Sequence, residues 1–124
     1  MDKNRRIIYI EDDPEMIDLV RLILERKNFD FWGAPGGWEG LELVRRHSPD
    51  IILLDLMMPD MDGLEICRKL REITQSPILI LSALDQPMMV ANALDAGADD
   101  YLVKPVSGAM LIAHLQNLSR RIKA

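Results

Sequence analysis

The sequence predicts an α/β domain with a doubly wound parallel sheet. Short apolar runs without polar alternation recur five times along the chain, a pattern typical of strands that are covered on both faces. Segments with apolar residues at helical spacing separate these runs. Five repeats of strand followed by helix favour a parallel sheet between two helical layers, joined by right-handed crossovers. A chain of 124 residues with 48% hydrophobic content has room for one such domain.

The predicted strands are short runs rich in Ile, Leu, Val and aromatic residues. They lie at 7–10 (IIYI), 29–32 (FDFW), 51–54 (IILL), 78–81 (ILIL) and 101–103 (YLV). The second run contains Asp30, and a charged residue inside a strand is typical of a sheet edge. We therefore expect 29–32 to be an edge strand.

Capping residues and helical periodicity predict the helices between these strands. Asp13 and Pro14 suit the N-cap and the first turn of the first helix. Asp62, with Glu65 three residues later, has the spacing of a capping box, and Ser107 opens the last helix. The apolar stripes are Met16, Val20, Ile23 and Leu24; Trp38, Leu41 and Val44; Ile66, Leu70 and Ile73; and Leu111, Leu115, Leu118 and Ile122. Trp32 and Trp38 are expected to pack against the domain.

Charge and composition limit the partners and the location. The formal net charge is -5. Proteins that bind nucleic acid or anionic membranes need a positively charged surface, so we expect no direct contact with either. The apolar run at 7–10 is too short for a signal peptide or a membrane span, which predicts a cytoplasmic protein. Cys67 is the only cysteine and lies among apolar residues at helical spacing, which indicates a core thiol.

Polar residues follow four of the five predicted strands. Glu11 and Asp12 follow the first strand, Asp55 the third, Ser82 the fourth and Lys104 the fifth. Ligands of such sheets bind beyond the carboxyl ends of the strands, so these side chains are expected to converge.

Three converging carboxylates favour a bound cation. Each ionised pair costs about 4 kcal/mol at about 4 Å and an effective dielectric of about 20. Because no His or Cys is among the candidates, Mg²⁺ suits the site better than zinc. Lys104 would then face an anion, and a carboxylate beside Mg²⁺, a hydroxyl and an ammonium suits the acceptance of a phosphoryl group.

Four motifs at these positions resemble the receiver domain of two-component response regulators. They are IEDDP (10–14), LLDLMMPDMDG (53–63), LSA (81–83) and GADDYLVKP (97–105). The likeness covers 1–124, and the last motif is similar to receivers of the winged-helix DNA-binding class. It implies a flavodoxin-like three-layer sandwich with five helices and strand order 2-1-3-4-5.

The resemblance implies a role for each acidic residue of these motifs. Asp55 is the phosphoacceptor, which takes its phosphoryl group from a sensor histidine kinase or a phosphotransfer protein. Glu11 and Asp12 form the acidic pocket. Asp12, Asp55 and the backbone carbonyl of Met57 are the implied ligands of Mg²⁺.

The same resemblance implies how phosphorylation is sensed. Ser82 and Lys104 bind phosphate oxygens, and Tyr101 reorients when they do. Receivers similar to this one commonly hold the Lys104-Pro105 bond in the cis form, against a general frequency of about 5% for bonds before proline.

Two other function classes remain open. A phosphatase-like enzyme of the haloacid-dehalogenase type places a second Asp two residues after its nucleophile, where this chain has Met57. A receiver-like interaction module that works without phosphate usually loses pocket residues, which this chain keeps. We therefore expect a switch rather than a turnover enzyme.

The lifetime of the phosphorylated state is a separate prediction. Because Met57 and Leu84 are apolar and do not orient an attacking water, the aspartyl-phosphate is predicted to be long-lived.

A further predicted helix, the fourth of five along the chain, lies at 87–94 (PMMVANAL) and indicates the output surface. Met88, Met89 and Val90 span about 200° of the helical wheel, so they cannot all face the core, although methionine also fills irregular gaps beneath a helix. Receivers of the winged-helix class pair through the fourth helix, fifth strand and fifth helix by ion pairs, and Val90 and Met110 stand where that class usually carries Lys and Glu. An apolar contact with a second subunit or an output partner is expected there, with Tyr101 at its edge.

Overall fold

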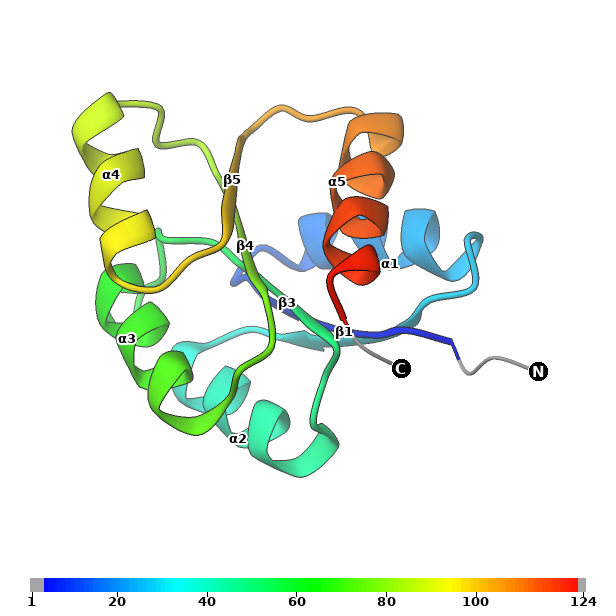
Figure 1. Cartoon of the computed structure of the whole chain (residues 1–124), viewed down its shortest axis with the longest axis horizontal. Coiled ribbons are helices and arrows are strands. Elements are labelled where there is room, and N and C mark those ends of the chain that lie inside the picture. Colours follow the sequence, from blue (N-terminus) through cyan, green and yellow to red (C-terminus); the bar gives the residue numbers. More distant parts are fainter. Residues whose placement is uncertain (1–3, 123–124) are drawn as a thin grey trace.

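Five parallel strands form the sheet of the computed structural model, which describes residues 4–122 (Figure 1). The strands are β1 (Arg6–Ile10), β2 (Asp30–Ala34), β3 (Ile51–Leu54), β4 (Ile78–Ser82) and β5 (Asp100–Val103). Their order is β2-β1-β3-β4-β5, and every pairing is parallel. The predicted fold class and strand order are confirmed, and β2 lies at an edge as Asp30 indicated.

Helices cover both faces of the sheet. They are α1 (Pro14–Glu25), α2 (Gly37–His47), α3 (Gly63–Ile73), α4 (Pro87–Asp95) and α5 (Gly108–Arg120). Figure 1 shows α1 and α5 on one face and α2, α3 and α4 on the other. Between residues 4 and 122 no helix has both the length and the apolar character that a membrane span requires.

Alternate residues of the central strands build two separate cores. In β1, Ile7 and Tyr9 join the core beneath α1 and α5, whereas Ile8 and Ile10 join the core beneath the other three helices. Successive side chains of a strand point to opposite faces, so a strand buried on both sides is apolar throughout. This geometry accounts for the unalternating runs in the sequence. Cys67 is fully buried in the core beneath α2, α3 and α4, which we call the second core. Burial raises the pKa of its thiol to about 11, as expected of a core cysteine.

The three predicted caps are confirmed. Asp13 accepts a hydrogen bond from the N–H of Glu15, and Asp62 accepts one from Leu64. Ser107 accepts one from Met110. Each bond satisfies an N–H of a first helical turn, which has no partner inside its own helix.

The prediction that Trp38 lies in the buried stripe of α2 is wrong. Its side chain is 60% exposed, and the Lys69 ammonium lies 5.6 Å from the centre of its ring. The buried face of α2 instead runs through Gly40, where an added Cβ would lie 2.5 Å from the Cδ1 of Ile10. The helix approaches β1 through this glycine, which turns Trp38 outward. Trp32 packs as expected, stacked on His47 at 4.6 Å between ring centres.

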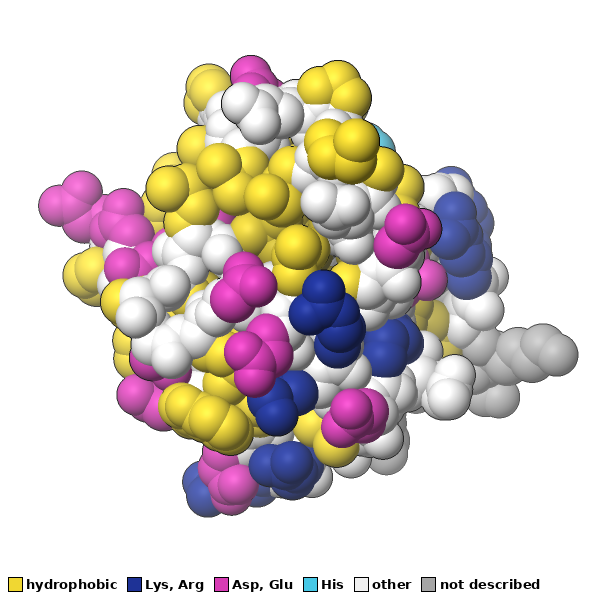
Figure 2. Space-filling view, turned by 90° about the vertical axis from the view of Figure 1, so that its left-hand side faces the viewer, with side chains coloured by type: hydrophobic (Ala, Val, Ile, Leu, Met, Phe, Trp, Pro, Cys, Tyr) yellow, Lys and Arg dark blue, Asp and Glu magenta, His cyan; other side chains and the backbone are white. Residues whose placement is uncertain are grey.

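The apolar residues of α4 divide between the core and the surface, as predicted. Met88 is 70% exposed, whereas Met89 and Val90 are half-buried and Met89 packs against the second core. Figure 2 looks onto this side of the molecule, and hydrophobic side chains gather over its upper part, where α4 lies. Part of α4 is therefore exposed apolar surface.

Candidate functional site

The register of the sheet places the predicted site residues at one edge. Ile10 pairs with both Ala34 and Leu54, so Glu11 and Asp55 leave neighbouring strands side by side. The backbone N–H of Asp55 donates to the carbonyl of Ile10 at 3.0 Å. The strand ends alone thus bring two of the predicted carboxylates together.

The ends of β4 and β5 are joined in the same way. Ser82 is the last residue of β4 rather than the residue after it, and it pairs with Val103. The N–H of Lys104 donates to the carbonyl of Ser82 at 2.8 Å. The predicted cis bond between Lys104 and Pro105 is confirmed.

Lys104 links the two buried carboxylates. Its Nζ lies 2.5 Å from Oε1 of Glu11 and 3.0 Å from Oδ2 of Asp55, and these acidic residues are 1% and 5% exposed. Burial lowers the pKa of Lys104, but its bonds to both carboxylates outweigh burial and raise that pKa overall. Burial raises the pKa of Glu11, and the contact with Lys104 opposes this rise. An isolated buried charge is very costly, so these charges depend on one another.

The Asp55 carboxylate is also held by the loop that follows it. Its Oδ1 accepts a hydrogen bond from the N–H of Met57 at 2.9 Å. The loop closes tightly against α3, because an added Cβ on Gly63 would lie 2.4 Å from the Cα of Leu56. Both Asp55 oxygens therefore have fixed partners.

Ser82 and Tyr101 meet at the loop between β4 and α4. Ser82 is fully buried, and its Oγ accepts a hydrogen bond from the N–H of Leu84 at 3.3 Å. The hydroxyl of Tyr101 donates to the carbonyl of Leu84 at 2.6 Å, and burial raises its pKa. A single loop residue thus joins the two residues assigned to sensing.

The structure arranges the acidic groups differently from a simple three-carboxylate cluster. Asp12 is exposed, whereas Glu11 and Asp55 enclose Lys104. Among residues 4–122, no group of three or more His, Cys, Asp and Glu side chains is arranged to hold a metal ion. The donor set that the resemblance implies, Asp12, Asp55 and the Met57 carbonyl, would consist of oxygen atoms only, which fits the chemistry of Mg²⁺.

Sequence reasoning missed two residues near this edge. Tyr9 is fully buried in β1 and donates its hydroxyl to Oε1 of Glu11 at 3.0 Å. Asp60, in the loop after β3, accepts hydrogen bonds from the N–H groups of Gly37 and Trp38 at 2.9 and 3.3 Å. Asp60 thereby caps α2, whose own N-cap residue is a glycine without a side-chain bond. The only sequence signal for Tyr9 was a hydroxyl within an apolar run.

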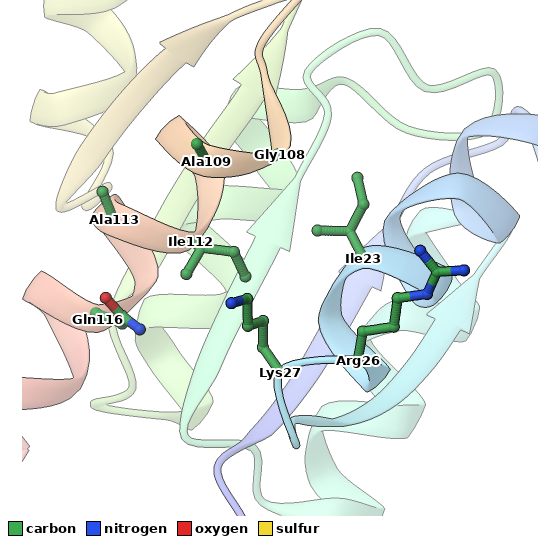
Figure 3. A pocket seen from close by; sticks show the side chains of 8 residues that line it. All are labelled: Ile23, Arg26, Lys27, Gly108, Ala109, Ile112, Ala113 and Gln116. Carbon is green, nitrogen blue, oxygen red and sulfur yellow. The ribbon is translucent and has the colours of Figure 1, made fainter.

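A groove lies between α1 and α5 (Figure 3). Its volume is about 540 Å³, and Ile23 and Ile112 face each other across it, with Lys27 reaching between the helices. None of its lining residues belongs to the site described above.

The fold and the site define a flavodoxin-like α/β domain with a buried aspartate–lysine cluster at the carboxyl ends of its strands. Residues 7–116 match the model of the response regulator receiver domain. The chain belongs to this family, as the four motifs indicated.

Relatives and solved structures agree with this membership. The chain is 40% identical over 121 residues to the transcriptional regulatory protein CseB of Streptomyces avermitilis, a match that covers 98% of this chain and 52% of CseB. The chain therefore spans about half the length of this curated relative. Its name agrees with the predicted likeness to receivers of DNA-binding regulators.

Two solved structures show the same architecture. A two-component response regulator from Clostridium difficile superposes with a TM-score of 0.94 at 28% identity, covering 98% of this chain and 100% of that one. The BeF3-activated N-terminal receiver domain of Klebsiella pneumoniae RstA superposes with a TM-score of 0.89 at 38% identity, covering 93% and 98%.

Proposed function

We propose that residues 1–124 form one receiver domain that switches its output when Asp55 is phosphorylated. The observation that carries this proposal is the buried Asp55 carboxylate at the end of β3, with the Lys104 ammonium 3.0 Å away. A sensor histidine kinase or a phosphotransfer protein supplies the phosphoryl group. Such a partner places the domain in the cytoplasm.

The chemistry is a transfer between a phosphohistidine and a carboxylate. An oxygen of Asp55 attacks the phosphorus, the P–N bond breaks, and its electron pair returns to the imidazole of the donor. Lys104 then donates to a phosphoryl oxygen in place of Glu11, and the Ser82 hydroxyl donates to another phosphoryl oxygen. Mg²⁺, held by Asp12, Asp55 and the Met57 carbonyl, would neutralise charge on the transferring group.

Release of the phosphoryl group is slow in this proposal, so the domain is a switch and not a turnover enzyme. Met57 is 56% exposed and Leu84 packs against the second core. Neither side chain has a polar group to orient a water for attack on the aspartyl-phosphate. A phosphatase-like enzyme of the haloacid-dehalogenase type would need an Asp as general acid at the position of Met57, and this chain has none there. A module that works without phosphate would leave the buried cluster of Glu11, Asp55 and Lys104 without a role.

The output face is the surface formed by Met88 and Leu94 of α4, Val103 of β5 and Met110 of α5. These four side chains are 70%, 45%, 40% and 50% exposed, and we assign the half-buried Val90 of α4 to the same face. Exposed apolar patches mark contact surfaces, and we assign this one to a second copy of the chain or to an output partner. Contact with DNA would belong to a part of the protein outside this acidic chain.

The test is phosphorylation by acetyl phosphate with Mg²⁺, read by intact mass. The wild type is expected to gain one phosphoryl group, and Asp55→Asn none. Asp18→Asn, an exposed acid on α1, is the matched control and should behave as the wild type. Uptake by Asp55→Asn, or no uptake by the wild type, would contradict the proposal.

The metal is tested in the same experiment. A chelator should abolish phosphorylation, and Mg²⁺ titration should move NMR signals near Asp12 with a millimolar-to-micromolar affinity, because few protein ligands hold the ion. Unmoved signals would exclude this metal site.

A further inference from the structure

Tyr9 places a phenol in the middle of a buried strand, directly beneath the phosphorylation edge. The residue is fully buried, and its ring meets the ring of Phe31 edge-on at 6.4 Å between centres. Its hydroxyl donates to Oε1 of Glu11 at 3.0 Å. Burial raises the pKa of Tyr9, so the hydroxyl stays protonated and remains a donor.

Glu11 receives three hydrogen bonds from different parts of the chain. Oε1 accepts from Tyr9 and from Lys104, and Oε2 accepts from the N–H of Asp13 at 3.3 Å. Lys104 is shared with Asp55, whereas the bond from Tyr9 comes from β1, two residues before Glu11. Tyr9 is thus the side-chain donor that does not depend on the state of Asp55.

The independence of the Tyr9 donor matters when Lys104 changes its hydrogen-bond partner. If its ammonium binds phosphoryl oxygens, Glu11 loses a strong donor while it stays 1% exposed. A buried carboxylate that loses its donors is costly, and this cost opposes the movement of Lys104. A second donor on the same oxygen reduces the cost.

We propose that Tyr9 is a positioning residue for phosphorylation, whose hydroxyl holds Glu11 in place while Lys104 moves from Glu11 to the phosphoryl group. The inference rests on the proposed function, since it assumes transfer to Asp55. Tyr9 itself does not touch the reacting atoms; it acts through Glu11. Its effect is to lower the barrier to the release of Lys104.

The direct test compares Tyr9→Phe, which removes only the hydroxyl, with Phe31→Leu, which loosens the same ring contact and keeps the hydroxyl. Tyr9→Phe is expected to lower the maximal rate of phosphorylation by acetyl phosphate about tenfold, the effect of one charge-assisted hydrogen bond. The half-saturating concentration of acetyl phosphate should not change. Phe31→Leu should stay near the wild-type rate.

A spectroscopic readout separates positioning from general loosening of the core. The ¹³C signal of the Glu11 carboxyl group should shift in Tyr9→Phe and stay in place in Phe31→Leu. In the wild type, the Tyr9 hydroxyl proton should remain protected from exchange when Mg²⁺ and beryllofluoride are added. This second measurement does not depend on the folding of any variant.

Three outcomes would overturn the inference: a wild-type rate in Tyr9→Phe, an equal loss in Phe31→Leu, or loss of the protected hydroxyl proton with beryllofluoride. Failure of the wild type to take up a phosphoryl group would instead contradict the proposed function. The two failures are therefore distinguishable.

Discussion

The strand-end site and the output face satisfy their side chains in opposite ways. At the site, Glu11, Asp55 and Ser82 are buried and each has hydrogen-bond partners. Throughout residues 4–122, no buried side-chain nitrogen or oxygen lacks such a partner. On the output face, Met88 and Met110 expose apolar surface that no other part of the described chain covers.

The difference shows where each region obtains its stabilisation. Buried charge is tolerated only with internal partners, so the site is held by its own bonds before any phosphate arrives. Exposed apolar surface contributes to stability only when another molecule covers it. We infer that the site determines when the switch acts, and the face determines on what.

The loop after β4 connects the two regions. Leu84 donates its N–H to Ser82 and accepts a bond from Tyr101. If the Ser82 side chain rotates to donate its hydroxyl to a phosphoryl oxygen, Oγ moves away from the N–H of Leu84, and the loop that holds Tyr101 is free to shift. A local change at Asp55 can reach the edge of the output face through this one residue.

The largest expected effect on stability comes from removing the cation of the site. Lys104→Met leaves Glu11 and Asp55 buried without their shared partner, which is expected to lower the free energy of unfolding by about 3 kcal/mol at neutral pH. Urea unfolding measures this loss. Added Mg²⁺ should recover part of it, because the ion supplies the missing positive charge. A loss below about 0.5 kcal/mol would mean that the site is not held by its internal charges.

The next effect concerns the lifetime of the phosphorylated state. Met57→Asn or Leu84→Glu adds a polar group that orients water, and each is expected to speed dephosphorylation about tenfold, equivalent to about 1.4 kcal/mol of barrier. The decay is followed by intact mass after removal of acetyl phosphate. Met57→Leu serves as the apolar control and should keep the wild-type rate. Unchanged decay in both polar variants would contradict the predicted long lifetime.

A smaller effect is expected from the cap that Asp60 supplies to α2. Hydrogen bonds from the N–H groups of Gly37 and Trp38 lower the pKa of Asp60 below its ordinary value of 3.8. Asp60→Ala should lower the free energy of unfolding by about 1 kcal/mol near neutral pH, the usual cost of replacing a capping side chain by alanine.

The pH dependence of that cost follows from the lowered pKa. The carboxylate stabilises the fold fully above its unfolded pKa of 3.8, and this contribution is lost as pH falls through the lower folded value. The difference in free energy of unfolding between the wild type and Asp60→Ala should therefore be constant near neutral pH and shrink below about pH 4. A difference in free energy of unfolding that grows in acid would exclude the capping of α2 by Asp60.

The smallest effect on stability is expected on the output face. Val90→Lys and Met110→Lys should change the free energy of unfolding by no more than about 0.5 kcal/mol, because neither side chain is fully buried. Light scattering with and without beryllofluoride should nevertheless show weakened self-association or partner binding. If neither substitution alters association, the contact surface lies elsewhere.

Much of the fold could be predicted because its signals are local. Unalternating apolar runs gave five strands, Asp30 marked the edge strand, and Asp13, Asp62 and Ser107 marked helix starts. These features depend on neighbours in the sequence, through strand pleat, helical period and first-turn N–H groups. Strand-end chemistry also placed Glu11 and Asp55 at one edge.

What only the tertiary structure decided were contacts between residues far apart in the sequence. Lys104 reaches Glu11 across 93 positions, and Asp60 caps Gly37 across 23. The exposure of Trp38 depends on the approach of Gly40 to Ile10, and the helical period alone could not show which side of α2 makes that approach. Which donor a buried carboxylate receives, and which face a helix turns inward, depend on how separate elements pack, because packing excludes the alternatives that the local sequence leaves open.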